Sequence, residues 1–183
     1  MNDREAVERL KKGEPGGLDA LVLAYQEKAI RTATLITRDD EIAKDAVQET
    51  FLRIYQRIRS FNETRSFEPY LLRSVVNTAI NMAEKQRGQV PLNEACSLAD
   101  VETLIARASS TEDQVEYNQL KARIAAALDK IPARDRAVIV ERYYLGMSEK
   151  EMADTHKVAP GTVKWLLNVA RKHLRARIGT END

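Results

Sequence analysis

The chain has 183 residues, enough for one large domain or two small ones, and its 43% apolar and 31% charged residues are typical of a folded protein. Its single cysteine, Cys96, excludes an internal disulfide and a cysteine-rich zinc site, and two histidines leave little material for another metal centre. No apolar run approaches the ~18 residues that suggest a membrane span, and the first residues are already charged. We therefore predict a cytoplasmic protein without a signal peptide or direct membrane insertion.

Charge is unevenly distributed along the chain although the net charge is only +1. Residues 155–180 contain six Lys or Arg and no acid, whereas residues 89–118 contain six acids and one base, Arg107. The distribution of charge, more than its total, indicates a partner. The basic C-terminal segment favours nucleic acid.

Residues 1–88 show helical periodicity nearly throughout. The pattern first predicts a short charged helix over 2–12 that ends at Gly13, a breaker at 15–17 and a helix over 18–36. A helix capped by Asp39 or Asp40 then runs to about Ser60. A polar loop over 60–67 leads into a helix from Ser66 to Arg87 with Pro69 in its first turn.

The helix after Asp39 has an apolar and an acidic side. Its predicted buried side comprises Val47, Phe51, Ile54, Tyr55 and Ile58. Its opposite side comprises Asp45, Gln48, Glu49 and Arg53. Paired carboxylates can act in catalysis, but no third group converges here, so a protein-binding or simply solvated face is the preferred interpretation. No phosphate-binding loop or nucleophile motif is present. We therefore predict that the protein is not an enzyme and that it binds no cofactor, metal or small-molecule substrate.

Aromatic and cationic residues alternate in the loop and the helix that follows. The aromatic members are Phe61, Phe67 and Tyr70, and the polar members are Arg65, Arg73, Asn77, Lys85 and Arg87. Aromatic rings beside cations suit unpaired bases, which stack on the rings while the cations hold the backbone. The alternative is that the aromatic residues form ordinary core, which is the commoner role of such side chains.

Residues 88–111 interrupt the helical pattern and predict an acidic linker, with a transient helical turn around 101–108. Helical periodicity returns near Glu112, pauses at Ile131-Pro132 and stops at Gly146. Ser148 to Glu151 fits a capping box. No strand is expected. The predicted fold is all-α, with a helical domain over 1–88, a flexible acidic linker over 89–114 and a second helical domain over 115–183.

The last helix is apolar on one side and cationic on the adjoining one. Its apolar sector holds Val163, Leu166, Leu167, Ala170, Leu174 and Ile178, and its polar sector holds Lys164, Asn168, Arg171, Lys172 and Arg175. A short capped helix, a turn and such a helix make a helix-turn-helix, whose second helix enters the major groove of DNA. The alternative is an amphipathic helix whose cations are only solvated.

Three stretches together resemble the extracytoplasmic-function class of bacterial sigma factors. DEIAKDAVQETFLRIYQRI (40–58) resembles the core-polymerase-binding helix, and FEPYLLRSVVNTAINMAEKQR (67–87) resembles the helix after the promoter-melting loop. ALDKIPARDRAVIVERYYLGMSEKEMA (127–153) followed by GTVK (161–164) resembles the domain that reads the minus-35 element. The resemblance covers roughly residues 8–87 and 115–178.

This resemblance implies roles that the residues alone only allow. It implies that Asp45, Gln48, Glu49 and Arg53 face the clamp helices of core RNA polymerase, and that the polymerase flap is a further contact. The loop Phe61 to Ser66 would capture a flipped minus-10 base, so the implied minus-10 contacts are Phe61, Asn62, Arg65, Ser66, Tyr70, Arg73, Asn77, Lys85 and Arg87. The acidic linker would thread toward the active-site cleft and the RNA exit path. An anti-sigma factor is a further implied partner.

The final helix departs from the usual family sequence. The turn lacks its usual Gly, and Pro160 pre-sets the backbone where a side-chain cap is missing. The implied minus-35 contacts are Pro160, Gly161, Thr162, Lys164, Trp165, Asn168, Arg171, Lys172 and Arg175. Trp165 and Val169 either form a protein-facing patch, or Trp165 packs on the preceding helix. The alternative function is a helix-turn-helix regulator that acts without core polymerase.

Overall fold

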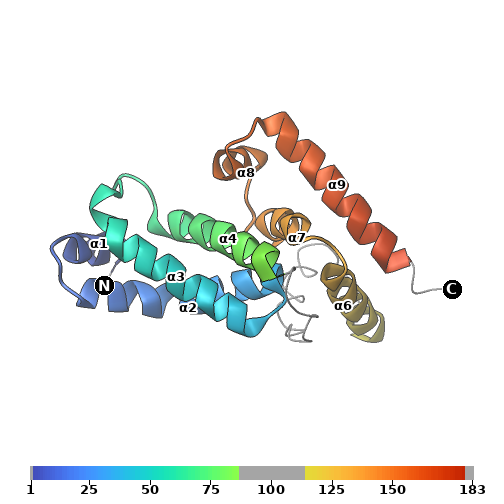
Figure 1. Cartoon of the computed structure of the whole chain (residues 1–183), viewed down its shortest axis with the longest axis horizontal. Helices are drawn as coiled ribbons and strands as arrows, with labels where there is room; N and C mark the ends of the chain where they lie inside the picture. The colour runs from blue at the N-terminus through green and yellow to red at the C-terminus, as the bar shows by residue number, and fades with distance from the viewer. Residues whose placement is uncertain (1, 87–113, 180–183) are drawn as a thin grey trace. The chain divides into compact units, whose positions relative to one another are not determined.

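The computed structural model of the chain describes residues 2–86 and 114–179 (Figure 1). The chain divides into two compact units, Met1–Pro91 and Leu92–Asp183. The described residues are helical and contain no strand. None of the helices in these ranges is long and apolar enough to cross a membrane. Of the predicted acidic linker over 89–114, only Gln114 belongs to the described residues. Cys96 lies outside them.

The first unit is a bundle of three long helices with a short helix added at its N-terminus (Figure 1). Its elements are α1 (Asp3–Lys11), α2 (Gly16–Thr37), α3 (Asp40–Arg57), a 3₁₀ turn η1 (Ile58–Ser60) and α4 (Phe67–Gln86). Helices α2, α3 and α4 pack against one another in every pair, and α1 packs on α2. Leu35, Ile36, Leu71 and Val75 are fully buried between them, and each such side chain contributes roughly 1.5–3 kcal/mol on burial.

Side-chain caps fix the helix starts in this unit. Asn2 Oδ1 accepts a hydrogen bond from the Glu5 amide at 2.8 Å. Asp39 Oδ1 accepts from the amides of Glu41 and Ile42 at 3.0 Å each, which confirms the predicted cap of α3.

Helix α2 begins two residues earlier than predicted, because Pro15 has helical backbone angles and Gly16 and Gly17 belong to the first turn. A Cβ at Gly17 would lie 2.4 Å from the backbone oxygen of Ala6. Glycine at this position therefore permits the close approach of α1 and α2 and is not a helix breaker.

The second unit is a smaller bundle around its last helix. Its elements are α6 (Gln114–Asp129), α7 (Ala133–Ile139), a π-helical turn η2 (Val140–Tyr144), α8 (Glu149–His156) and α9 (Pro160–Gly179). Helix α9 packs against α6, α7 and α8.

The sequence predicts one continuous helix through Leu145, but the chain widens into a π turn after Ile139. There the Leu145 amide donates to the Val140 carbonyl at 2.9 Å. The capping box is confirmed: Ser148 Oγ accepts from the Glu151 amide at 3.2 Å, and Glu151 Oε2 accepts from the Ser148 amide at 2.8 Å.

Candidate nucleic-acid interface

Helices α8 and α9 form the two helices of the predicted helix-turn-helix. Lys157, at the position after α8, adopts the left-handed conformation with φ 54°, where the usual residue is glycine. The Val158 amide donates to the Ala153 carbonyl at 3.1 Å, and the Thr162 amide donates to the Ala159 carbonyl at 2.9 Å. The turn is therefore closed by backbone hydrogen bonds at both ends.

The two sides of α9 differ in burial as the sequence predicts. Val163, Leu167 and Ala170 are buried. The exposed residues among the predicted DNA contacts are Pro160, Gly161, Thr162, Lys164, Trp165, Asn168, Lys172 and Arg175. These residues form a cationic outer surface on the second helix of the helix-turn-helix.

Arg171 differs from the other predicted cations of α9 because it is half-buried. Its Nε donates to the Tyr143 hydroxyl at 2.8 Å, and its guanidinium carbon lies 5.7 Å from the centre of the Tyr143 ring. Arg171 therefore joins α9 to η2 in addition to its predicted place at the DNA surface.

Trp165 is 61% exposed, so the interpretation that it packs on the preceding helix is wrong. Val169, one turn further along α9, is half-buried. A large exposed aromatic ring is available for contact with a partner, so the prediction of a partner-facing Trp165 stays open.

A buried ionisable pair lies under the helix-turn-helix and was not anticipated from the sequence. The Glu141 side chain is fully buried, and its Oε2 lies 2.6 Å from His156 Nε2. Its other oxygen, Oε1, is buried without a hydrogen-bond partner among the described residues. A signal exists in the sequence, because Glu141, in η2, directly follows the apolar run 137–140.

The aromatic residues of the 60–67 loop are largely core. Phe61 and Phe67 are 8% and 2% exposed, with ring centres 5.9 Å apart in an edge-on arrangement. Tyr70 packs on Phe61 at 4.8 Å, and Tyr25 packs on Phe67 at 5.9 Å. The Phe61 ring is a packing element and not an exposed stacking surface, which corrects its place among the predicted minus-10 contacts.

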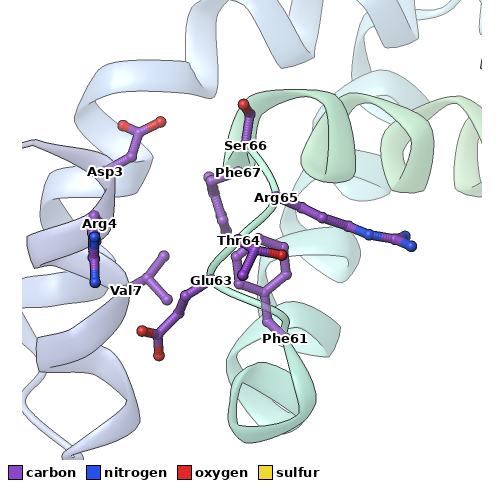
Figure 2. A pocket seen from close by; sticks show the side chains of 9 residues that line it. All are labelled: Asp3, Arg4, Val7, Phe61, Glu63, Thr64, Arg65, Ser66 and Phe67. Atoms are coloured by element: carbon purple, nitrogen blue, oxygen red, sulfur yellow. The ribbon is translucent and has the colours of Figure 1, made fainter.

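The residues between the two phenylalanines form an exposed polar turn. Asn62 Oδ1 accepts from the Thr64 amide at 3.0 Å and from the Thr64 hydroxyl at 2.9 Å. Asn62, Arg65 and Ser66 are exposed, as the minus-10 prediction requires. Figure 2 shows this turn facing α1 across a cavity of about 270 Å³, with Arg65 extending away from α1.

Helix α4 continues the polar surface that the loop begins. Arg73 and Asn77 are four residues apart and share one side of the helix, and at ~100° per residue Lys85 lies about 80° round from Asn77. Asn77 and Lys85 are exposed and Arg73 is half-buried. Arg87 lies outside the described residues.

The outer side of α3 is exposed and mixes acids with apolar side chains. Asp45, Gln48, Glu49 and Arg53 are all exposed, and Glu49 pairs with Arg53. Tyr55 is 46% exposed, so its predicted burial is wrong. At about 100° per residue it lies at the edge of the buried sector, next to Leu52, which is 52% exposed.

The comparisons with known families match both units. Sigma-70 region 2 matches residues 21–89, and Sigma-70, region 4 matches residues 121–174. The chain is 28% identical over 183 residues to an ECF RNA polymerase sigma-E factor of Haemophilus influenzae, covering 97% of the chain and 96% of the relative. It is 26% identical over 182 residues to the ECF RNA polymerase sigma factor SigW of Bacillus subtilis, covering 97% of each.

Solved structures share the fold. The structure of CnrH in complex with the cytosolic domain of CnrY superposes with a TM-score of 0.66 at 20% identity, covering 98% of this chain and 99% of that one. The sigma factor RpoE in complex with the anti-sigma factor NepR from Bartonella quintana gives a TM-score of 0.63 at 20% identity, covering 88% of this chain and 96% of that one.

The two matched regions, in this order on one chain, define a two-domain transcription initiation factor. The chain belongs to the extracytoplasmic-function class of the sigma-70 family of RNA polymerase sigma factors.

Proposed function

We propose that this chain binds core RNA polymerase in the cytoplasm, directs it to minus-35 and minus-10 promoter elements, and promotes DNA opening. The domain over 115–183 reads the minus-35 element, and the domain over 1–88 binds core polymerase and the minus-10 element. The observation that carries the proposal is the exposed cationic side of α9 on a capped helix-turn-helix, in a chain that also matches sigma-70 region 2. When bound to polymerase, the protein associates with the nucleoid.

Minus-35 recognition uses the start and the outer side of α9. The second helix of a helix-turn-helix enters the major groove with its N-terminal residues toward the bases. Lys164 and Asn168 are exposed near that end, where Lys neutralises phosphates and Asn pairs with adenine edges. Lys172 and Arg175 lie further along and hold the phosphate backbone.

Minus-10 recognition uses the exposed turn after η1 and the outer side of α4. Asn62, Arg65 and Ser66 offer hydrogen-bonding groups to an unpaired base, whose extrusion from the duplex costs a few kcal/mol. The buried Phe61 and Phe67 hold the two ends of this turn. The separated DNA strand then runs along α4, where it contacts Tyr70, Arg73, Asn77 and Lys85.

Core-polymerase binding uses the outer side of α3. Leu52 and Tyr55 are exposed among Asp45, Gln48 and Glu49. Protein interfaces typically have an apolar centre with a polar rim, and a few residues, often Tyr, Trp or Arg, supply most of the affinity. We assign this surface to the clamp helices of the polymerase, and the second domain to its flap.

An anti-sigma factor is a further partner under this proposal. The superposed structures include RpoE bound to an anti-sigma factor, and CnrH bound to the cytosolic domain of CnrY. Trp165 is the largest exposed apolar side chain of α9 and offers an anchor for such a protein.

In-vitro transcription on a promoter library tests the proposal directly. Core polymerase with this chain should yield transcripts that share two upstream elements, and core alone should yield none. Failure of the chain to bind core polymerase even at low salt would overturn the proposal. Specific DNA binding in that case would instead support the regulator that acts without core polymerase.

A further inference from the structure

Helix α1 lies before the residues that match sigma-70 region 2, which begin at position 21, yet it faces the predicted base-capturing loop. Figure 2 shows α1 and the 61–66 loop on opposite sides of the cavity, with Asp3, Arg4 and Val7 contributed by α1. The helix is held firmly, because Ala6, Val7 and Leu10 are buried.

A hydrogen bond also joins α1 to the bundle. The Tyr25 hydroxyl of α2 donates to Asp3 Oδ2 at 2.5 Å. Burial, together with this hydrogen bond to a carboxylate, raises the pKa of Tyr25 well above its ordinary value, so the hydroxyl keeps its proton. Helix α1 is therefore held in place on the bundle and can position the loop through its own side chains.

Lys11, the last residue of α1, fastens the loop at two points. Its Nζ donates to the Phe61 carbonyl oxygen at 2.8 Å and lies 2.6 Å from Glu63 Oε1. The two side chains are only 23% and 32% exposed, so solvent screens their pairing less than it screens fully exposed pairs. The hydrogen bond from Lys11 lowers the pKa of the Glu63 carboxyl, which favours the carboxylate form.

The other contacts of the loop act over short distances or through apolar packing. Asn62 organises only its own turn, and Phe61 and Phe67 bury only the two ends. Lys11 binds a backbone oxygen and a mid-loop carboxylate together, and it does so from a residue 50 positions earlier than Phe61. Without the Lys11 ammonium group, the Glu63 carboxylate loses this ion pair and the Phe61 carbonyl oxygen loses this hydrogen-bond donor.

We infer that Lys11 is a positioning residue that holds the 61–66 loop against α1 in the shape that receives an unpaired promoter base. It acts through the loop and not by touching DNA, so α1 becomes part of the promoter-opening machinery. The inference rests on the proposed function, because it assigns the base-capturing role to the same loop.

The test uses holoenzyme assembled from core polymerase and this chain, with forked promoter DNA whose upstream minus-10 base is unpaired. A second probe replaces that base with an abasic site. Wild-type holoenzyme should bind the first probe more tightly, and the ratio of the two affinities measures base capture. Lys11→Met keeps the aliphatic stem and should reduce this ratio about tenfold, the usual effect of losing a hydrogen bond to a charged group. Lys11→Arg should restore most of it.

The matched control is Lys28→Met, which removes a lysine from the exposed Lys28–Glu68 pair between α2 and α4 and should leave the ratio unchanged. Glu63→Gln, which removes the carboxylate charge from the loop side of the link, should lower the ratio as well. Thermal melting and core-polymerase affinity establish that each variant is folded and assembled.

An unchanged ratio in both Lys11→Met and Glu63→Gln overturns the inference, as does an equal weakening of binding to both probes. A wild-type chain that forms no holoenzyme, or binds both probes equally, instead overturns the proposed function.

Discussion

Two cations on α9 that look alike in the sequence have different surroundings in the structure. Lys164 is exposed near the start of the helix, whereas Arg171 is half-buried and donates to the Tyr143 hydroxyl. Substituting either one removes a positive charge from the predicted DNA surface. Only the loss of Arg171 also removes a contact between α9 and η2.

We therefore expect Lys164→Ala to weaken promoter binding and to reduce the slope of log affinity against log salt by about one. Its free energy of unfolding should stay within about 0.5 kcal/mol of wild type, as for most exposed substitutions. Arg171→Ala should lower the free energy of unfolding by about 1–2 kcal/mol. Salt titrations of DNA binding and urea denaturation check both; equal stability losses would contradict the difference in burial.

At the scale of single elements, two adjacent glycines in α2 have opposite requirements. A Cβ at Gly17 would meet the Ala6 carbonyl oxygen at 2.4 Å and the Leu10 amide nitrogen at 2.8 Å. A Cβ at Gly16 would meet nothing within 4 Å. The first position sets the distance between α1 and α2, and the second does not.

Gly17→Ala should lower the free energy of unfolding by about 1–3 kcal/mol, because backbone atoms of α1 must move to admit the methyl group. Gly16→Ala is the matched control and should be neutral or raise it by up to about 1 kcal/mol, since alanine favours helix. Urea denaturation followed by circular dichroism measures both. A tolerated Gly17→Ala would show that α1 is not held closely on α2.

The pair formed by Glu141 and His156 joins η2 to the end of α8, directly before the turn into α9. Removing one member leaves the other buried without its partner. Replacing both with apolar side chains removes the requirement altogether.

We expect His156→Ala to lower the free energy of unfolding by about 3 kcal/mol, and Glu141→Leu with His156→Leu together to change it by less than about 1.5 kcal/mol. Chemical denaturation of the single and double variants forms the test. A double variant as unstable as the single one would show that the pair contributes more than its burial costs.

The helix-turn-helix and the two helix caps at Asp39 and Ser148 could be predicted from the sequence, since they depend on residues within a few positions of one another. The sequence leaves the burial of Phe61 as one of two alternatives, and the Glu141–His156 pair and the contacts of Lys11 could not be predicted from it. They depend on which helices meet in space, and Lys11 and Phe61 are 50 residues apart. Helical periodicity also does not decide the burial of residues at the edge of an apolar sector. For this reason the sequence predicts a buried Tyr55, which is 46% exposed.

At the scale of the whole molecule, the proposed function places two DNA-reading units on one chain. Under that proposal each unit offers a modest set of contacts, so we expect affinity for a promoter to come from tethering both units on one polymerase. The distribution of charge along the sequence indicates a nucleic-acid partner, which the net charge of +1 does not.

Cutting the chain into residues 1–88 and 115–183 should therefore reduce promoter binding by about 10²–10⁴ when both pieces are added to core polymerase, although each piece keeps its own partner. Gel-shift titration with the pieces separately, together and joined measures the loss. Full binding by the mixed pieces would show that one unit carries the affinity alone.

Trp165 is the only tryptophan of the chain, and it is 61% exposed on the side of α9 assigned to DNA. Its intrinsic fluorescence is therefore an optical reporter that needs no added dye. Because the indole emission depends on contact with water, occupation of this surface by DNA or by a protein will change the signal. Binding to this surface of α9 can therefore be followed in solution by the fluorescence of one native residue.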